Sequence, residues 1–249
     1  MRHLARTSRF IAILAMALAV AACAHAQDDD DAPGKLSSLI ATADFNHDGI
    51  PDMAEATTPA KGQTGPSILT LSLGLPNGSF QPTAIKLVLD HTPHCIVTGD
   101  FNHDGTPDLI IGSEDGTVQL VLGDGNGGLS PARTIAHLDS VVSIAVADLN
   151  HDGIPDLAIT DWRASNVTVL LGNGTGAFHP TFSAPLRMGG TTPHLAIADF
   201  NGDGIPDLAV VYDEDDGDTY DVLLGNGTGV FTPAPNLGYA RDPNSHCVT

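Results

Sequence analysis

Short apolar runs separated by turn residues recur along the chain from about residue 36 onward. Leu157–Ile159 and Val167–Leu171 are two neighbouring examples, and Gly, Asn and Asp gather between such runs. Apolar runs of this length with turn residues on both sides predict strands rather than helices. About four of them fit into each stretch of about fifty residues, and four strands per repeat is the make-up of a propeller blade.

A nine-residue polar segment divides these runs into four repeats. Its copies begin about fifty residues apart and are Asp44–Asp52, Asp100–Asp108, Asp148–Asp156 and Asp199–Asp207. Each copy has Asp at positions one, five and nine, Asn at position three, Gly at position six and Pro at position eight. A period of this size indicates a stacked or circular repeat architecture.

A glycine-rich segment follows each polar segment. The glycine that opens it is followed six residues later by Phe or Leu, and two residues further on by Pro. The opening residues are Gly74, Gly123, Gly172 and Gly225. The residues in between, such as Asn173–Gly176, are of the kind that adopt positive φ in hairpin turns, so they predict the connection between the third and fourth strands.

The residues just before each polar segment predict the innermost strand of a blade. Larger apolar residues alternate there with small ones, as in Ile144–Ala147, and neither side carries a charge. Such a taper suits a strand buried on both faces where neighbouring sheets converge. The first repeat departs from the pattern, because Glu55 stands where the others carry Ile or Val and because Thr57–Ser67 predicts a long exposed loop.

The sequence therefore predicts an all-β fold, a β-propeller of four four-stranded blades. The predicted blades cover residues 36–91, 92–139, 140–190 and 191–240, and residues 241–249 form a C-terminal tail. Four blades is the lower limit for a closed propeller. We expect a closed or nearly closed monomer. An open stack of four blades and a larger ring made by two chains are the alternatives.

The nine-residue segment has the composition of a calcium-binding loop. Ca²⁺ takes six to eight oxygen ligands from carboxylates, amides, backbone carbonyls and water. Positions one, three, five and nine offer side-chain oxygens, position seven offers its carbonyl, and glycine at position six allows a sharp turn. We expect about four Ca²⁺ ions, one in each loop. The predicted ligands are Asp44, Asn46, Asp48, Ile50, Asp52, Asp100, Asn102, Asp104, Thr106, Asp108, Asp148, Asn150, Asp152, Ile154, Asp156, Asp199, Asn201, Asp203, Ile205 and Asp207.

Two other interpretations of these loops are weaker. An EF-hand opens with the same residues but needs Glu at position twelve and flanking helices. Position twelve is occupied by Glu55, Ile111, Ile159 and Val210. Simple polar turns would not require the same oxygen-bearing residue at each ligand position in four copies. His47, His103 and His151 at position four predict solvated side chains rather than zinc ligands or proton carriers.

The first 26 residues predict a secretory signal peptide. Three Arg residues precede the apolar run Phe10–Ala22, and Ala24–Ala26 has the small residues of a cleavage site. Residues 27–35 then form an acidic linker. Val20–Cys23 resembles a bacterial lipobox, so a lipid anchor at Cys23 is the alternative. Either route predicts a secreted or envelope location, and no other run is long enough to cross a bilayer.

The two remaining cysteines are Cys95 and Cys247. An oxidising compartment allows them to pair, although their spacing does not demand it. Two separate thiols are the alternative.

The charge balance and the chemistry-bearing residues limit the function. The chain carries 30 Asp and Glu against 10 Lys and Arg, a formal net charge of −20, which excludes a nucleic-acid binder. No pairing of a nucleophile with a base stands out, so we expect a non-enzyme. Asp161, Trp162 and Arg163 form a polar and aromatic cluster that is the first place to look for a ligand.

The loops and the hairpins of the type Leu171–Phe178 resemble the FG-GAP/VCBS-type repeat over roughly residues 36–240. Such repeats build calcium-bearing blades in integrin α-subunits and in bacterial secreted proteins, and the absence of the literal Phe-Gly and Gly-Ala-Pro signatures favours the bacterial branch. The resemblance implies that the loop residues given above hold calcium. It also implies a non-catalytic binding or adhesion module for a protein or glycan. A polysaccharide-active enzyme on a similar scaffold and a subunit of a larger envelope assembly are the alternatives.

Overall fold

The computed structural model describes residues 37–59, 64–186, 193–212 and 219–234. These residues form sixteen strands and no helix. The predicted signal peptide, acidic linker and C-terminal tail lie outside the described residues. Within the described part, no helix is long and apolar enough to cross a membrane.

The strands form four antiparallel sheets, each made of four strands that follow one another in sequence. The first sheet contains β1 (Ser37–Ala43), β2 (Asp52–Thr58), β3 (Ser67–Gly74) and β4 (Phe80–Leu89). The second contains β5 (Pro93–Gly99), β6 (Asp108–Ser113), β7 (Thr117–Val121) and β8 (Arg133–His137). The third contains β9 (Val141–Ala147), β10 (Asp156–Asp161), β11 (Asn166–Gly172) and β12 (Phe178–Pro185). The fourth contains β13 (Pro193–Ala198), β14 (Asp207–Tyr212), β15 (Thr219–Gly225) and β16 (Phe231–Pro233).

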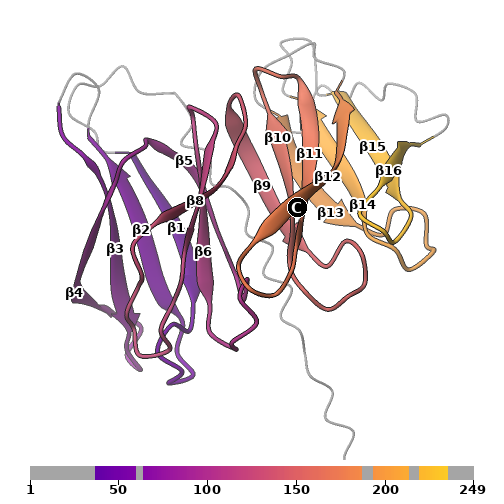
Figure 1. Cartoon of the computed structure of the whole chain (residues 1–249). Helices are drawn as coiled ribbons and strands as arrows, with labels where there is room; N and C mark the ends of the chain where they lie inside the picture. Colours follow the sequence, from indigo (N-terminus) through magenta and orange to yellow (C-terminus); the bar gives the residue numbers. More distant parts are fainter. Residues whose placement is uncertain (1–36, 60–63, 187–192, 213–218, 235–249) are drawn as a thin grey trace, which may run out of the picture.

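The four sheets are the predicted blades, and they stand side by side in chain order (Figure 1). Their innermost strands contact one another in the order β1, β5, β9 and β13. In the described residues the fourth sheet does not pack back onto the first to any comparable extent, so the propeller is open. The expectation of a closed or nearly closed monomer is therefore wrong. Each sheet turns relative to its neighbour by an amount set by their packed side chains, and four such sheets do not complete a circle.

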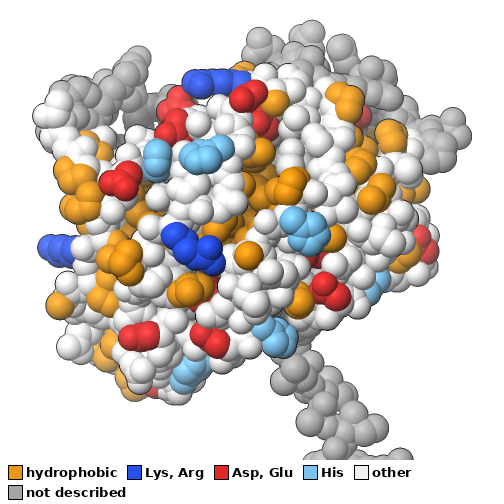
Figure 2. Space-filling view, viewed as in Figure 1, with side chains coloured by type: hydrophobic (Ala, Val, Ile, Leu, Met, Phe, Trp, Pro, Cys, Tyr) orange, Lys and Arg blue, Asp and Glu red, His pale blue; other side chains and the backbone are white. Residues whose placement is uncertain are grey.

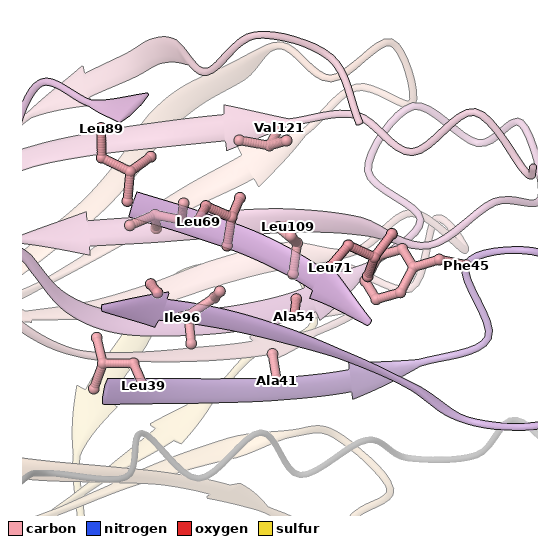
Figure 3. Close-up of a cluster of buried hydrophobic side chains, with 12 residues drawn as sticks. Leu39, Ala41, Phe45, Ala54, Leu69, Leu71, Leu89, Ile96, Leu109 and Val121 are labelled. Carbon is pink, nitrogen blue, oxygen red and sulfur yellow. The ribbon is translucent and has the colours of Figure 1, made fainter. Parts of the chain in front are cut away.

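Three hydrophobic clusters hold the stack together, one at each junction between neighbouring sheets. In the first, Leu39 and Ala41 of β1 lie opposite Ile96 of β5 and Leu109 of β6 (Figure 3). The small residues predicted on one side of each inner strand allow this approach, because a short side chain leaves room for the next sheet. Two sheets thus share each core.

Candidate metal centres

The four acidic loops lie at the same edge of the stack, the lower edge in Figure 1. Each connects the first and second strands of its sheet, and its ninth residue is the first residue of the second strand. Because all four sheets have the same strand order, the loops recur in equivalent places.

Each loop is closed by hydrogen bonds from its own backbone amides to its acidic and amide side chains. In the third loop, Asp148 accepts the N–H of Asp152 at 3.1 Å and the N–H of Gly153 at 2.9 Å. Asn150 accepts the Asp152 N–H at 3.0 Å, and Asp152 accepts the N–H of Ile154 at 2.8 Å. The first, second and fourth loops repeat this set. The predicted ligands at positions one, three and five therefore converge within each loop.

Two left-handed residues make this curl. Glycine at position six has φ between 84° and 87°, as predicted for the sharp turn. Position four is also left-handed, with φ of 58°, 58° and 61° at His47, His103 and His151 and of 79° at Gly202. Sequence analysis missed this second turn, although histidine tolerates positive φ better than most side chains.

The ninth residue has a structural role that sequence analysis did not foresee. The side chain of Asp156 is fully buried, and its two oxygens accept the N–H groups of Leu149 and Gly172, each at 2.8 Å. Asp52, Asp108 and Asp207 make the same two bonds in their sheets. This carboxylate therefore ties the loop to the end of the third strand.

The glycine at the end of the third strand is required by the same contact. A Cβ atom on Gly172 would lie 2.4 Å from the carbonyl oxygen of Pro155, and its three counterparts are equally crowded. Only glycine allows the backbone to approach closely enough for its N–H to reach Asp156. A glycine recurs at this place in all four repeats, but its separation from the ninth residue varies between 22, 15, 16 and 18 residues, so spacing alone did not reveal the bond.

The donor chemistry of each loop suits a hard cation. Carboxylate oxygens at positions one and five and an amide oxygen at position three lie together, and position nine lies behind them. The pKa of Asp156 is raised to about 6, mainly because the group is buried and also because Asp152 and Asp148 are negative neighbours. A cation would relieve that repulsion. Among the described residues, no three His, Cys, Asp or Glu side chains form a group that could hold a metal ion.

We expect the stability of the calcium-free protein to fall as the pH rises from about 4 to about 6. Burial raises the pKa values of both Asp108 and Asp156 to about 6. The folded state therefore binds protons that the unfolded state releases, and raising the pH through this window favours unfolding. A shift of about two pKa units corresponds to about 3 kcal/mol for each carboxyl group.

Urea unfolding at pH 4.5 and pH 7 measures this effect, with protein stripped of calcium by EGTA at neutral pH and then exchanged into calcium-free buffer at each pH. The variant Asp156→Asn, which has no titrating group at that place, should lose its share of the pH dependence. A calcium-free protein that is more stable at pH 7 than at pH 4.5 would contradict the expectation.

The histidines at position four reach the following blade. Nε2 of His47 lies 3.4 Å from Oγ1 of Thr106 in the second acidic loop. A Cβ atom on Gly125 would lie 3.2 Å from the His47 ring, and one on Gly227 would lie 3.5 Å from the His151 ring. The side chains are exposed, as expected, but they also pack against the next hairpin rather than being wholly solvated.

A polar hollow of about 260 Å³ lies among the connections of the first three sheets, away from the acidic loops. It is lined by Asp90, His91, Thr92, Glu114, Asp115 and Arg163. Nδ1 of His91 lies 2.6 Å from Oδ2 of Asp115. Acidic, basic and histidine side chains are visible together on the upper part of the face in Figure 2.

Only part of the predicted cluster around Trp162 belongs to this hollow. Arg163 lines the hollow. Trp162, its neighbour in the sequence, is 38% exposed and is not among the lining residues. Asp161 is buried and accepts the backbone N–H groups of Asp139, Ser140 and Ala164, so it holds the turn instead of facing a ligand.

A pairing of Cys95 with Cys247, which the sequence allows but does not demand, falls partly outside the described residues. Cys95 is fully buried in β5, and Cys247 lies outside the described residues.

The sheets and their loops define a class: open all-β repeat proteins whose four-stranded blades each carry an acidic loop. The model of the FG-GAP-like repeat matches residues 44–111, 100–159 and 150–210. Because the matched residues make up more than half of the sequence, the chain belongs to the FG-GAP-like repeat family. The resemblance expected from the sequence is thereby confirmed.

No curated protein matches the chain. Among solved structures, a mutant Tc holotoxin pore of Photorhabdus luminescens is similar to 82% of the chain at 15% identity with a TM-score of 0.44, but the chain spans only 12% of that toxin chain. The crystal structure of BBS1N in complex with ARL6DN, soaked with lead, matches 79% of the chain and 82% of its own, at 13% identity with a TM-score of 0.34.

Proposed function

We propose that this protein is a secreted or envelope-attached module that binds calcium in its four acidic loops and binds a protein or glycan without catalysis. The observation that supports calcium binding is the repetition of one donor set in one local structure at a single edge of the stack. The apolar N-terminal run with its cleavage motif supports secretion.

The residues of each loop have two different roles. Positions one, three and five present oxygens to the ion while they hold the curled backbone. Position nine anchors the loop to the sheet, which limits the movement of the other donors. A bound Ca²⁺ would supply the positive charge that these crowded carboxylates lack. The result would be a rigid edge suited to presenting a binding surface.

Asp152→Ala should remove one calcium ion and leave three. The variant loses the donor at position five of the third loop but keeps the buried anchor Asp156. Isothermal titration calorimetry and elemental analysis after desalting give the stoichiometry. Thr175→Ala, in an exposed hairpin without predicted ligands, is the matched control and should retain about four ions. A wild type that retains no calcium at millimolar supply would refute the proposal.

The binding role is tested with immobilised protein exposed to glycan arrays and to proteins of the native host, with calcium and with EGTA. Calcium-dependent capture of a glycan or protein supports the proposal. Copurification of a fixed set of envelope proteins would instead support the assembly-subunit alternative.

One observation favours the second candidate, a polysaccharide-active enzyme. The polar hollow places His91 against Asp115, a pairing that can move a proton, and Arg163 lies in the same lining beside the acidic Asp90 and Glu114. Sustained cleavage of a polyuronide that is abolished by Arg163→Ala would replace the non-catalytic proposal with this one.

A further inference from the structure

Among the described residues, the first and fourth sheets each have one face that no other sheet covers. We call the face toward the preceding sheet upstream and the face toward the following sheet downstream. Of the large hydrophobic side chains exposed among the described residues, Ile40, Phe80 and Val88 lie in the first sheet and Phe200 lies in the fourth acidic loop. The only other one is Trp162. Exposed apolar side chains are thus concentrated at the two ends of the stack.

The exposed Phe200 has buried counterparts in the other three loops. Phe45, Phe101 and Leu149 occupy the same second position, and each is at most 1% exposed, whereas Phe200 is 47% exposed. Phe101 packs edge-on against Phe178 of the next sheet, with ring centroids 5.8 Å apart. Phe200 differs because the described structure contains no following sheet to cover it.

The exposed Phe80 is the other half of the same contact. Phe80 is the counterpart of Phe178 and Phe231 in the later sheets. Phe231 packs against the third sheet and is only 3% exposed, whereas Phe80 is 45% exposed. Ile40 behaves in the same way, because it is 47% exposed while its counterparts Ile96 and Ile144 are 3% and 1% exposed. The upstream face of the first sheet and the downstream face of the fourth therefore carry the two sides of one repeated interface.

The side chains at position four of the loop and at the facing hairpin residue differ in size at the two ends in a way that supports their pairing. In the internal interfaces a histidine at position four of one loop meets a glycine in the next hairpin, as His47 meets Gly125. At the ends the sizes are reversed: position four of the fourth loop is Gly202, and the hairpin residue of the first sheet is Pro76. The space above Gly202 is open, and nothing lies within 4 Å of a Cβ built there. The smaller residue on one face thus leaves room for the larger one on the other.

We propose that two copies of this chain join head to tail, the fourth sheet of each against the first sheet of the other, to form a closed ring of eight blades. Eight blades lie within the range of known propellers, and a two-fold ring leaves neither face exposed. In this ring Phe200 packs on Phe80 of the second copy, as Phe101 packs on Phe178 within one chain.

The charged residues at these faces agree with this pairing. Ile111 and Leu39 pack together in the first hydrophobic cluster. The equivalent positions at the two terminal faces hold Glu55 in the first repeat and His194 in the fourth. The Glu55 carboxylate on one face could accept a hydrogen bond from the His194 ring on the other. One internal contact is not reproduced, because the N–H of Gly78 bonds within its own turn to Leu75, whereas Gly127 donates to the preceding loop. Side chains would therefore hold the junction.

Sedimentation equilibrium of the calcium-loaded protein at increasing concentration tests the ring. The wild type should have twice the mass of one chain, with no larger species. Phe80→Asp and Phe200→Asp should each raise the dissociation constant by about 100-fold or more, because each would bury an unpaired charge. Trp162→Asp, which changes an exposed aromatic residue on neither terminal face, should remain dimeric. Circular dichroism checks that all three variants fold.

Mixing the two dissociating variants distinguishes this arrangement from others. A head-to-tail pair made from Phe80→Asp and Phe200→Asp retains one unaltered junction, so the mixture should associate more tightly than either variant alone. A wild-type monomer at all concentrations would overturn the proposal. So would filaments that grow with concentration, or a dimer that persists in Phe80→Asp, which would indicate pairing of two fourth sheets.

Discussion

Removing calcium with EGTA should lower the melting temperature of this protein by about 20 °C or more. Ions that bind only the folded loops stabilise the native state by about 2.7 kcal/mol per site at a hundred times the dissociation constant, or about 11 kcal/mol for four such sites. For a domain of this size, each kcal/mol shifts the melting temperature by about 2–4 °C. The effect is large because each loop brings several carboxylates together, and in the second and third loops the neighbouring Asp side chains help to raise the pKa of the buried Asp108 and Asp156.

Thermal unfolding followed by circular dichroism, with EGTA and then with excess calcium restored, measures the shift. Magnesium at the same concentration is the control for a general effect of ionic strength, and it should restore much less stability because it requires a stricter octahedral geometry. An unchanged melting temperature in EGTA would show that the loops hold their structure through hydrogen bonds alone.

Asp156→Ala should lower the free energy of unfolding by about 3–5 kcal/mol even without calcium. The substitution removes the acceptor for two buried N–H groups, on Leu149 and Gly172, and each unsatisfied group costs about 1–3 kcal/mol. It also detaches the third acidic loop from the end of β11. Urea unfolding in EGTA separates this effect from the loss of a metal ligand.

The matched control is Asp152→Ala in the same loop and the same buffer. Asp152 is exposed and accepts the N–H of Ile154 within the loop, so its loss should cost about 1 kcal/mol or less without calcium. Equal losses of stability in the two variants would mean that position nine is not the anchor of the loop.

Much of the fold was predictable because each repeat is a local unit. The strands around Leu157–Ile159 and Val167–Leu171 follow from short apolar runs, and their hairpin follows from Asn and Gly residues that accept positive φ. The order of strands within each sheet follows from the short connections. Four copies of the same pattern then predict four copies of the same sheet.

The acidic loops were predictable as clusters of donors but not in their division of roles. Spacing in sequence placed Asp148, Asn150 and Asp152 on one curl, and the structure brings them together. Asp156 has the same residue type but is buried behind them. Its second bond reaches Gly172, sixteen residues further along the chain, and local spacing alone does not reveal such a contact.

The amino-acid sequence by itself determined the repeats, the strands, the family and the oxygen donors, because all of these depend on residues close together in the chain. Only the tertiary structure decided that the stack is open, that position nine anchors the loops, and that Phe80 and Phe200 are exposed at its two ends. Those features depend on how far each sheet turns against its neighbour and on which faces find a partner. A repeat sequence encodes the interface between neighbouring sheets once per repeat. Whether the last sheet meets the first depends on the rotation between neighbouring sheets, summed over the whole stack.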